Sequence, residues 1–207
     1  MASLFAATPA NNLPKDERYN VCPTTQIAVV TSFEGMRHLR PMRWGFLPNW
    51  YKGPTDGPLL INARAETIAE KPAFRAACHE RRCLIPAAGF YEWTKDADGH
   101  RLPWYFYDTA GAPLVFAGIW QDWARDEQAF TTCAIITTSA GQTMSEVHHR
   151  EPVTLSPDQW AMWLGEEGKG AARLMTAAPE DRIARYRVNP KVNSNRAQGP
   201  DLIEPFE

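Results

Sequence analysis

Hydrophobic and polar positions alternate along much of the chain, a pattern that predicts a protein built mainly from strands. Residues 26–33 (QIAVVTSF) form a clear β-rich run, and Glu34-Gly35 supplies a turn after it. We predict a second strand within 36–46 and expect Pro41 to place it at a sheet edge or a bulge, because proline donates no hydrogen bond. Three more strands, behind a hairpin loop at 95–103, are predicted at 104–108, 113–120 and 130–138.

Helical spacing is confined to short segments. A helix is predicted to open at Lys71, where Pro72 is tolerated in the first turn, and a second helix follows the cap at Ser156. The other predicted elements are the end of an amphipathic helix in SLFAA (3–7), a short helix within 165–180, and strand-like pieces at 185–190 and 202–206. Because no internal repeat or interdomain linker is found, we predict one α+β domain over residues 1–207 with a curved, antiparallel sheet.

Residues 60–93 combine polar side chains with strand-like runs, a composition that does not suit a segment buried entirely in the hydrophobic core. Asn62 and Arg64 occupy alternate positions of LINAR, so a strand there would point both side chains to one face. Glu92 shares its face with Phe90 and stands among aromatic residues. An amide, a guanidinium and a carboxylate on consecutive elements predict a small polar site.

The net charge of −2 excludes a protein that is basic overall but leaves a local basic channel open. Trp44 and Trp50 alternate with cations such as Arg43, an arrangement that suits the stacking of unpaired bases beside phosphates. Arg75 and Arg82 add a basic face to the predicted helix. The alternatives are that the aromatic side chains plug the core and that the basic ones form an ordinary solvated helix face.

The cysteines and the N-terminus bear on whether the chain is a disulfide-bonded, metal-binding, secreted or membrane protein. The four cysteines show no CxxC pairing and no metal-ligand spacing, so we predict reduced thiols in a cytoplasmic protein with no metal and no cofactor. The N-terminus lacks the features of a signal peptide, and no stretch approaches the roughly 18 apolar residues that span a bilayer. We therefore expect no membrane association.

Several long motifs then follow one another in a fixed order. They are RYNVCPTTQ (18–26), RWGFLPNW (43–50), LINARAET (60–67), CLIPAAGFYEW (83–93), FAGIW (116–120), ITT (136–138), VHHREPVTL (147–155) and VNSNRAQGPDLIEPF (192–206). Together they resemble the SRAP family, the SOS-response-associated peptidase-like proteins that process abasic sites in single-stranded DNA. The resemblance runs from about residue 18 to the C-terminus.

The resemblance implies a strongly curved, barrel-like, mainly antiparallel sheet flanked by helices, with a positively charged cleft for single-stranded DNA. It also implies a monomer whose peptidase activity removes its own initiator methionine. In the family, a cysteine directly after that methionine, in an M-C-G-R start, condenses with the ring-opened abasic sugar to form a thiazolidine. The helper residues of the family fall on Asn62, Glu92 and His148.

These residue types suit the roles that the resemblance gives them. A partly buried Glu92 would have a raised pKa and could move the proton that opens the sugar, and His148 could protonate the sugar oxygen. Asn62 could orient the sugar. The alternatives are an ordinary surface carboxylate and an ordinary loop histidine, and His149 and Glu151 depart from the family pattern. The expected DNA-binding residues are Arg43, Trp44, Trp50, Arg64, Arg75, Arg82, Arg150, Asn193 and Asn195.

The nucleophile of the family is missing, because position 2 is Ala and no M-C-G-R element is present. One interpretation is that Met1 is an internal methionine of a longer chain. If the chain begins here, the α-amine of Ala2 could form an imine with an aldehyde. A second interpretation, from another class, is a non-catalytic module that binds single-stranded DNA. A third, a thiol protease, needs a cysteine paired with His148; Cys22 is expected to be structural.

Overall fold

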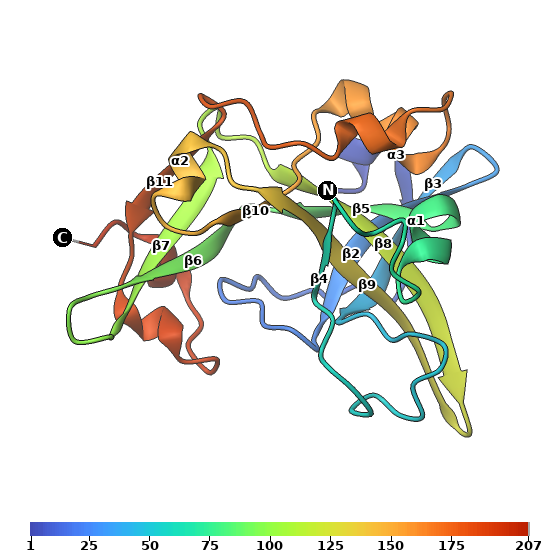
Figure 1. Ribbon diagram of the computed structural model, residues 1–207, viewed down its shortest axis with the longest axis horizontal. Coiled ribbons are helices and arrows are strands. Elements are labelled where there is room, and N and C mark those ends of the chain that lie inside the picture. The colour runs from blue at the N-terminus through green and yellow to red at the C-terminus, as the bar shows by residue number, and fades with distance from the viewer. Residues whose placement is uncertain (207) are drawn as a thin grey trace.

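The structure is a computed structural model that describes residues 1–206, and it contains a closed barrel and a smaller sheet beside it (Figure 1). The barrel strands are β2 (Gln26–Phe33), β3 (Met36–Trp44), β5 (Arg82–Ala87), β8 (Leu114–Arg125) and β9 (Gln128–Ser139). The ring closes because β9 pairs with β8 along one edge and with β3 further along the strand. Apart from the parallel β3–β9 contact, the ring is antiparallel, which confirms the predicted fold class.

Three short strands extend the barrel and carry part of the candidate site: β1 (Ala7–Pro9), β4 (Asn62–Arg64) and β10 (Arg150–Pro152). The pairing of β1 with β3 and of β4 with β9 is parallel, whereas β10 pairs with β9 in antiparallel fashion. Both β4 and β10 therefore lie against the C-terminal half of β9. This arrangement brings residues 62–64 and 150–152, far apart in the sequence, to one region of the barrel.

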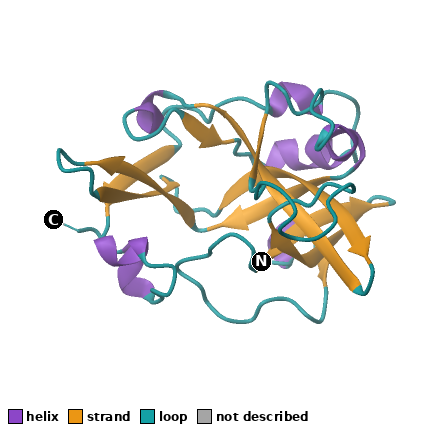
Figure 2. Cartoon of the chain, turned by 60° about the horizontal axis from the view of Figure 1, so that its bottom comes forward, coloured by secondary structure: helices purple, strands orange, loops and turns teal. Residues whose placement is uncertain are grey.

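The second sheet contains β6 (Gly89–Lys95), β7 (Arg101–Asp108) and β11 (Ile183–Arg187), and it lies to the left of the barrel in Figure 1. Its strands are antiparallel, and their register places Glu92, Trp104 and Arg187 side by side. The helices are short and lie around the sheets (Figure 2). They are η1 (Ser3–Phe5), α1 (Arg75–Glu80), α2 (Gln142–Ser145), η2 (Pro157–Gln159), α3 (Trp160–Leu164), η3 (Ala171–Leu174), η4 (Pro190–Asn193) and η5 (Pro200–Ile203).

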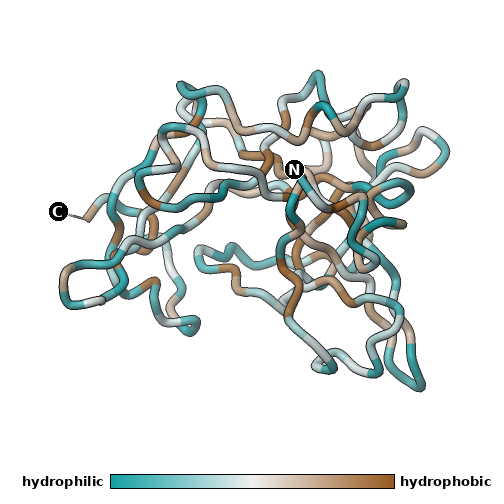
Figure 3. The backbone as a smooth tube through the Cα atoms, viewed as in Figure 1, coloured by the Kyte–Doolittle hydropathy of each residue, from teal (hydrophilic) through white to brown (hydrophobic). Residues whose placement is uncertain are grey.

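Alternate residues of the barrel strands feed two buried clusters, as the period of two in a strand requires. One cluster joins the strands to α1 and α3, and it includes Phe5, Ala63 and Trp163. The other joins the strands to the second sheet through residues such as Phe106 and Phe116. Figure 3 shows these hydrophobic segments gathered in the strands, while the loops are largely hydrophilic. The two clusters fix the second sheet and the helices on opposite faces of the strands.

Pro41 corrects the predicted edge position of the second strand. β3 is an interior strand that runs without a break, and Pro41 pairs with Ala28 of β2. On its other side, the pairing with β1 ends at Leu39 and the pairing with β9 begins at Arg43. The missing N–H of Pro41 therefore falls in a gap between two partners, where no ladder bond is lost.

The two ends of the chain also differ from the predictions. The SLFAA segment is the single turn η1 followed by β1, and Ala6 between them has a φ of 49°. In the LIEPF segment, Leu202 and Ile203 end the 3₁₀ turn η5, and Pro205 forms one isolated bridge with Val188. Within β8, Gly118 marks a close approach, since a Cβ there would lie 2.7 Å from Ile85 and 2.9 Å from Cys83.

Candidate functional site

Glu92 and His148 meet at the junction between the second sheet and the barrel. Glu92 lies on β6 on the same face as Phe90, whose ring stacks on Phe106 at 4.9 Å, so the predicted face is confirmed. His148 follows α2, and its Nδ1 lies 3.9 Å from Oε1 of Glu92. An acid–base pair is therefore formed by residues 56 positions apart on different elements (148 − 92).

The electrostatic setting of Glu92 favours the retention of a proton. Burial raises the pKa of Glu92, and the charges of His148 and Arg101 and a backbone hydrogen bond oppose this shift only in part. The side chain is still 29% exposed, so a ligand can reach the carboxyl group. A carboxyl group with a raised pKa beside an imidazole can donate and accept protons, as general acid–base catalysis requires.

His148 is oriented by the backbone of Arg150. Its Nδ1 lies 3.0 Å from the carbonyl oxygen of Arg150 and 3.2 Å from the amide nitrogen of the same residue. A neutral ring can donate to the carbonyl from Nδ1 or accept from the amide, according to its tautomer. Since Nδ1 is engaged in either case, Nε2 is the nitrogen that a ligand would meet.

Arg150 is held by Glu66, a residue that the sequence analysis did not assign to the site. The two terminal nitrogens of Arg150 bind the two carboxylate oxygens of Glu66 at 2.7 and 2.8 Å, and Nη2 also donates to the carbonyl of Thr137 at 2.6 Å. These bonds lower the pKa of Glu66 to about 2. The fork of Arg150 that was expected to hold phosphate is thus occupied by Glu66.

Asn62 and Arg64 lie on β4 as exposed residues on either side of Ala63, which is 1% exposed. Both side chains line an open groove of about 560 Å³, whose other walls include Trp50, Lys71 and Phe74. Trp50 is 55% exposed, so one of its ring faces is available for stacking. The structure therefore brings together Asn62, Arg64 and Trp50, and it adds Lys71 as a cation that the sequence analysis missed.

Other predicted DNA-binding residues make internal contacts. Arg82 starts β5, donates to the carbonyls of Cys78, His79 and Trp163, and closes the end of α1. Arg43 donates to the carbonyl of Gly45, and Trp44 donates from its ring nitrogen to Ile61. Arg75 is exposed on α1.

The two predicted asparagines lie at the end of the chain near the second sheet. Asn193 accepts a hydrogen bond from the indole of Trp93 at 2.7 Å and donates to the carbonyl of Arg101. Asn195 is exposed. Trp104, which the sequence analysis left out of the site, is flanked by the guanidinium groups of two arginines of β11, each 5.3 Å from its ring. The RYR pattern of 185–187 was the available signal for this cluster.

The thiols offer no partner for His148. Cys83 and Cys133 are fully buried, and burial raises the pKa of both thiols. Cys78 is half-buried with a raised pKa, and Cys22 points to Asn20. Among residues 1–206, the polar contacts of the His148 side chain involve Glu92 and Arg150. This geometry does not support the thiol-protease interpretation.

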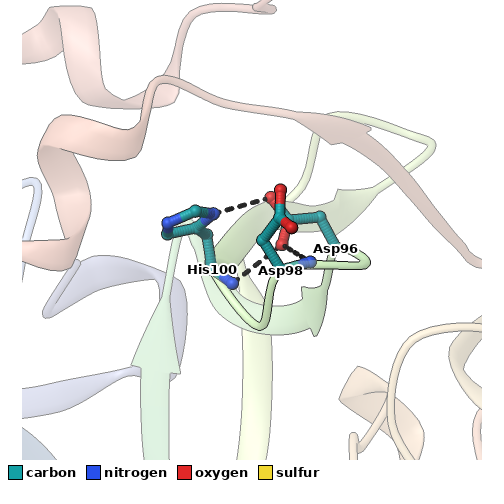
Figure 4. Close-up of side chains that lie close together, drawn as sticks. All are labelled: Asp96, Asp98 and His100. Carbon is teal, nitrogen blue, oxygen red and sulfur yellow. Dashed lines mark hydrogen bonds and ion pairs between the residues drawn. The ribbon is translucent and has the colours of Figure 1, made fainter.

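An acidic cluster in the β6–β7 hairpin has a structural explanation (Figure 4). Oδ1 of Asp96 accepts the amide hydrogens of Asp98 and His100 at 3.0 and 2.8 Å, and Oδ2 lies 3.1 Å from the ring of His100. The cluster therefore shapes an exposed turn. Within the described residues, no helix has the length and apolar character needed to cross a membrane.

Comparison with known proteins gives consistent matches. The model of the family described as SOS response associated peptidase (SRAP) matches residues 1–195. Abasic site processing protein YoqW of Bacillus subtilis is 34% identical over 199 residues, which cover 93% of this chain and 89% of that protein. Abasic site processing protein YedK of Escherichia coli is 31% identical over 212 residues, covering 98% and 93%. A crystal structure of a Bacteroides thetaiotaomicron protein superposes with a TM-score of 0.77 at 25% identity, covering 89% of this chain and 82% of that one.

Proposed function

Because the chain belongs to the SOS response associated peptidase (SRAP) family, we propose that it binds single-stranded DNA at abasic sites. The observation that carries the proposal is the Glu92–His148 pair, in which a carboxyl group with a raised pKa lies 3.9 Å from an oriented imidazole. Relatives named abasic site processing proteins support the choice of substrate. The groove lined by Trp50, Asn62 and Arg64 supplies a path for the strand.

In this proposal, the chain's own residues open and hold the abasic sugar. The sugar is mostly a closed hemiacetal, so a proton must move before the aldehyde is exposed. Glu92 moves that proton, and Nε2 of His148 donates to the ring oxygen. The amide of Asn62 orients the opened sugar, while Arg64 and Lys71 neutralise the flanking phosphates.

The covalent step differs from the one that the family resemblance implies. Ala2 stands after Met1, so the thiol needed to close a thiazolidine is absent at that position. We propose that any covalent step uses the α-amine of Ala2 once Met1 is removed. The amine nitrogen adds to the aldehyde carbon, the carbonyl oxygen leaves as water, and an imine forms. Loss of the proton at C2′ then allows the 3′ phosphate to leave as the C3′–O bond breaks.

The alternative is a non-catalytic module that binds single-stranded DNA, and the same observation at Ala2 favours it. Both candidates use the groove and the Glu92–His148 site to recognise the lesion. They differ only in whether a bond forms between protein and DNA. An in-frame M-C-G-R element in the upstream coding DNA would instead supply a thiol from a longer chain, whereas a stop codon would exclude that source.

Two measurements test the proposal. Fluorescence anisotropy with one strand that carries an abasic site or an intact base should show tighter binding of the abasic strand. Equal affinities would reject abasic-site recognition. A denaturing gel after borohydride reduction then separates the two candidates: a trapped adduct supports the amine chemistry, and its absence, with the preference retained, supports the non-catalytic module.

A further inference from the structure

The Glu92–His148 pair spans two separately built parts of the molecule. Glu92 is carried by β6 of the second sheet, whereas His148 lies between α2 and β10, on the barrel side. Within residues 1–206, no strand pairing joins the two sheets. The separation between the acid and the base therefore depends on the short covalent connection from β5 to β6 and on contacts at the junction.

One carboxylate at this junction is not used by the proposed chemistry. Glu151, in β10, is 3% exposed. Its Oε2 accepts the amide hydrogen of Gly141 at 2.8 Å, and its Oε1 accepts that of Ala178 at 2.7 Å. Gly141 precedes α2, and Ala178 lies in the segment that enters β11. A single buried side chain thus holds the start of the His148 loop and the entry to the second sheet.

Neighbouring contacts strengthen the same junction. Glu151 shares the walls of a small cavity with Phe90 of β6 and Ile183 of β11. Arg185 of β11 donates to the carbonyl of Thr143 and to the carboxylate of Glu146, so it ties α2 to the second sheet. Figure 1 shows α2 beside β11, with β10 leading away toward the barrel.

A buried carboxylate needs strong partners, because an uncompensated charge away from water is costly. Here, both oxygens accept charge-assisted hydrogen bonds from backbone amides. An apolar residue of similar size would fill the space but leave both amides unpaired. The position therefore calls for a group with two acceptors, and a carboxylate is the side chain that offers them.

We propose that Glu151 is a positioning residue that fixes the His148 loop to the second sheet and thereby sets the separation of Glu92 and His148. The consequence for DNA rests on the proposed function, whereas the geometric claim does not. Misplacement of a reacting group by about 1 Å can lower a rate by about 10²-fold. A change in the Glu92–His148 separation on loss of the Glu151 contacts would therefore impair the site.

The substitution Glu151→Gln tests this proposal because it keeps the size of the side chain and removes one of the two acceptors. The Gln amide group would face a backbone N–H, so one anchor is lost. In the wild-type protein, replacing Glu92 by Gln should shift the NMR resonances of the His148 ring, because its Nδ1 lies 3.9 Å from Oε1 of Glu92. In the Glu151→Gln background, that shift should shrink, and the preference for an abasic strand should fall by about tenfold or more.

Glu166→Gln is the matched control, since Glu166 pairs with Arg37 and contacts none of the described site residues. It should leave unchanged both the effect of Glu92→Gln on the His148 resonances and the preference for an abasic strand. If Glu151→Gln does not fold, Arg185→Lys, which removes the fork to Thr143 and Glu146, should shift both readouts in the same direction. The proposal would be overturned if Glu92→Gln changed the His148 resonances as much in a folded Glu151→Gln variant as in the wild-type protein. The same result in Arg185→Lys, when that variant is used, would also overturn it. If the wild-type protein shows no abasic preference, the proposed function fails while the NMR comparison still tests Glu151.

Discussion

The N-terminal segment, residues 1–10, and the Glu92–His148 site are both held in place by burial and hydrogen bonds, but only the site carries reactive side chains. In the segment, Phe5 is fully buried and its ring packs at a tilt against Trp160 with the centroids 4.6 Å apart, and β1 pairs with β3. Arg37 also donates to the carbonyl of Phe5. None of these contacts depends on the side chain at position 2.

The packing of Phe5 and the pairing of β1 with β3 hold the segment, and Ala2 packs against the same core cluster. The segment is therefore docked without a thiol at position 2. The Glu92–His148 site, in contrast, places a carboxyl group beside an imidazole, and the amide of Asn62 lines the groove. In the proposed function, the chain recognises an abasic sugar although position 2 lacks the thiol that would capture it.

The largest expected effect is a gain of chemistry from Ala2→Cys. If the segment presents position 2 to the bound sugar, the new amine and thiol should close a thiazolidine, and a denaturing gel should show a heat-stable adduct where the wild-type protein shows none without borohydride. Ala2→Ser is the control, because a hydroxyl does not replace the thiol. No adduct with Ala2→Cys would mean that position 2 lies out of reach of the sugar.

The next largest effect concerns the Glu92–His148 site. In the Ala2→Cys background, Glu92→Gln should slow adduct formation by about 10²- to 10⁴-fold, the usual contribution of a positioned general acid–base. Adduct yield against time measures the rate. Glu127→Gln, in the exposed turn between β8 and β9, should leave the rate unchanged. An equally unaffected Glu92→Gln variant would remove Glu92 from the proton transfers.

A stability measurement tests whether the N-terminal segment belongs to the folded core. Phe5→Ala should lower the free energy of unfolding by about 3–5 kcal/mol, because it empties a fully buried aromatic site. Leu4→Ala, at a side chain that is 49% exposed, should change it by no more than about 0.5 kcal/mol. Urea denaturation distinguishes the two, and similar values for both variants would contradict the docked segment.

Arg64→Ala should weaken the binding of abasic and intact single strands alike, because a phosphate contact carries no information on the lesion. The slope of log affinity against log salt should fall in magnitude by about 0.7, the value for one phosphate on a single strand. Arg82→Ala should leave the slope unchanged, since Arg82 is bound to carbonyls at the end of α1. If Arg82→Ala lowered the slope and Arg64→Ala did not, the DNA strand would lie on the face of α1 and not in the groove.

The smallest effect is a pH dependence of stability. The folded state binds the Glu92 proton more tightly than the unfolded chain, because burial raises the pKa of Glu92 above its ordinary 4.5. This contribution is present below pH 4.5 and is lost as the pH rises through the raised value. The difference in melting temperature between wild type and Glu92→Gln should therefore decline over that window. A difference that grows with pH would mean that the pKa of Glu92 is depressed.

Local patterns predicted the elements better than the contacts between them. The alternation in 26–33 marked β2 with its observed bounds, and the alternate positions of Asn62 and Arg64 gave their shared face. The interior position of β3 could not be predicted, because the tolerance of Pro41 depends on where β1 and β9 stop pairing. These limits are set by segments distant in the sequence.

The candidate site shows the same division. The types of Glu92 and His148 could be singled out from the sequence, but their separation depends on how α2 and β10 meet the second sheet. The pairing of Arg150 with Glu66, 84 positions away, was also beyond local reasoning. Arg150 was expected to bind a DNA phosphate. In the structure, its two terminal guanidinium nitrogens instead bind the carboxylate of Glu66.

The central claim is that the site recognises an abasic sugar without a thiol, and a single paired measurement tests it most directly. Wild-type protein is titrated with one strand that carries either an abasic site or an intact base, and each sample is then run on a denaturing gel without borohydride. The account predicts tighter binding of the abasic strand and no heat-stable band. Equal affinities, or a heat-stable band from the wild-type chain with Ala2 at its start, would contradict it.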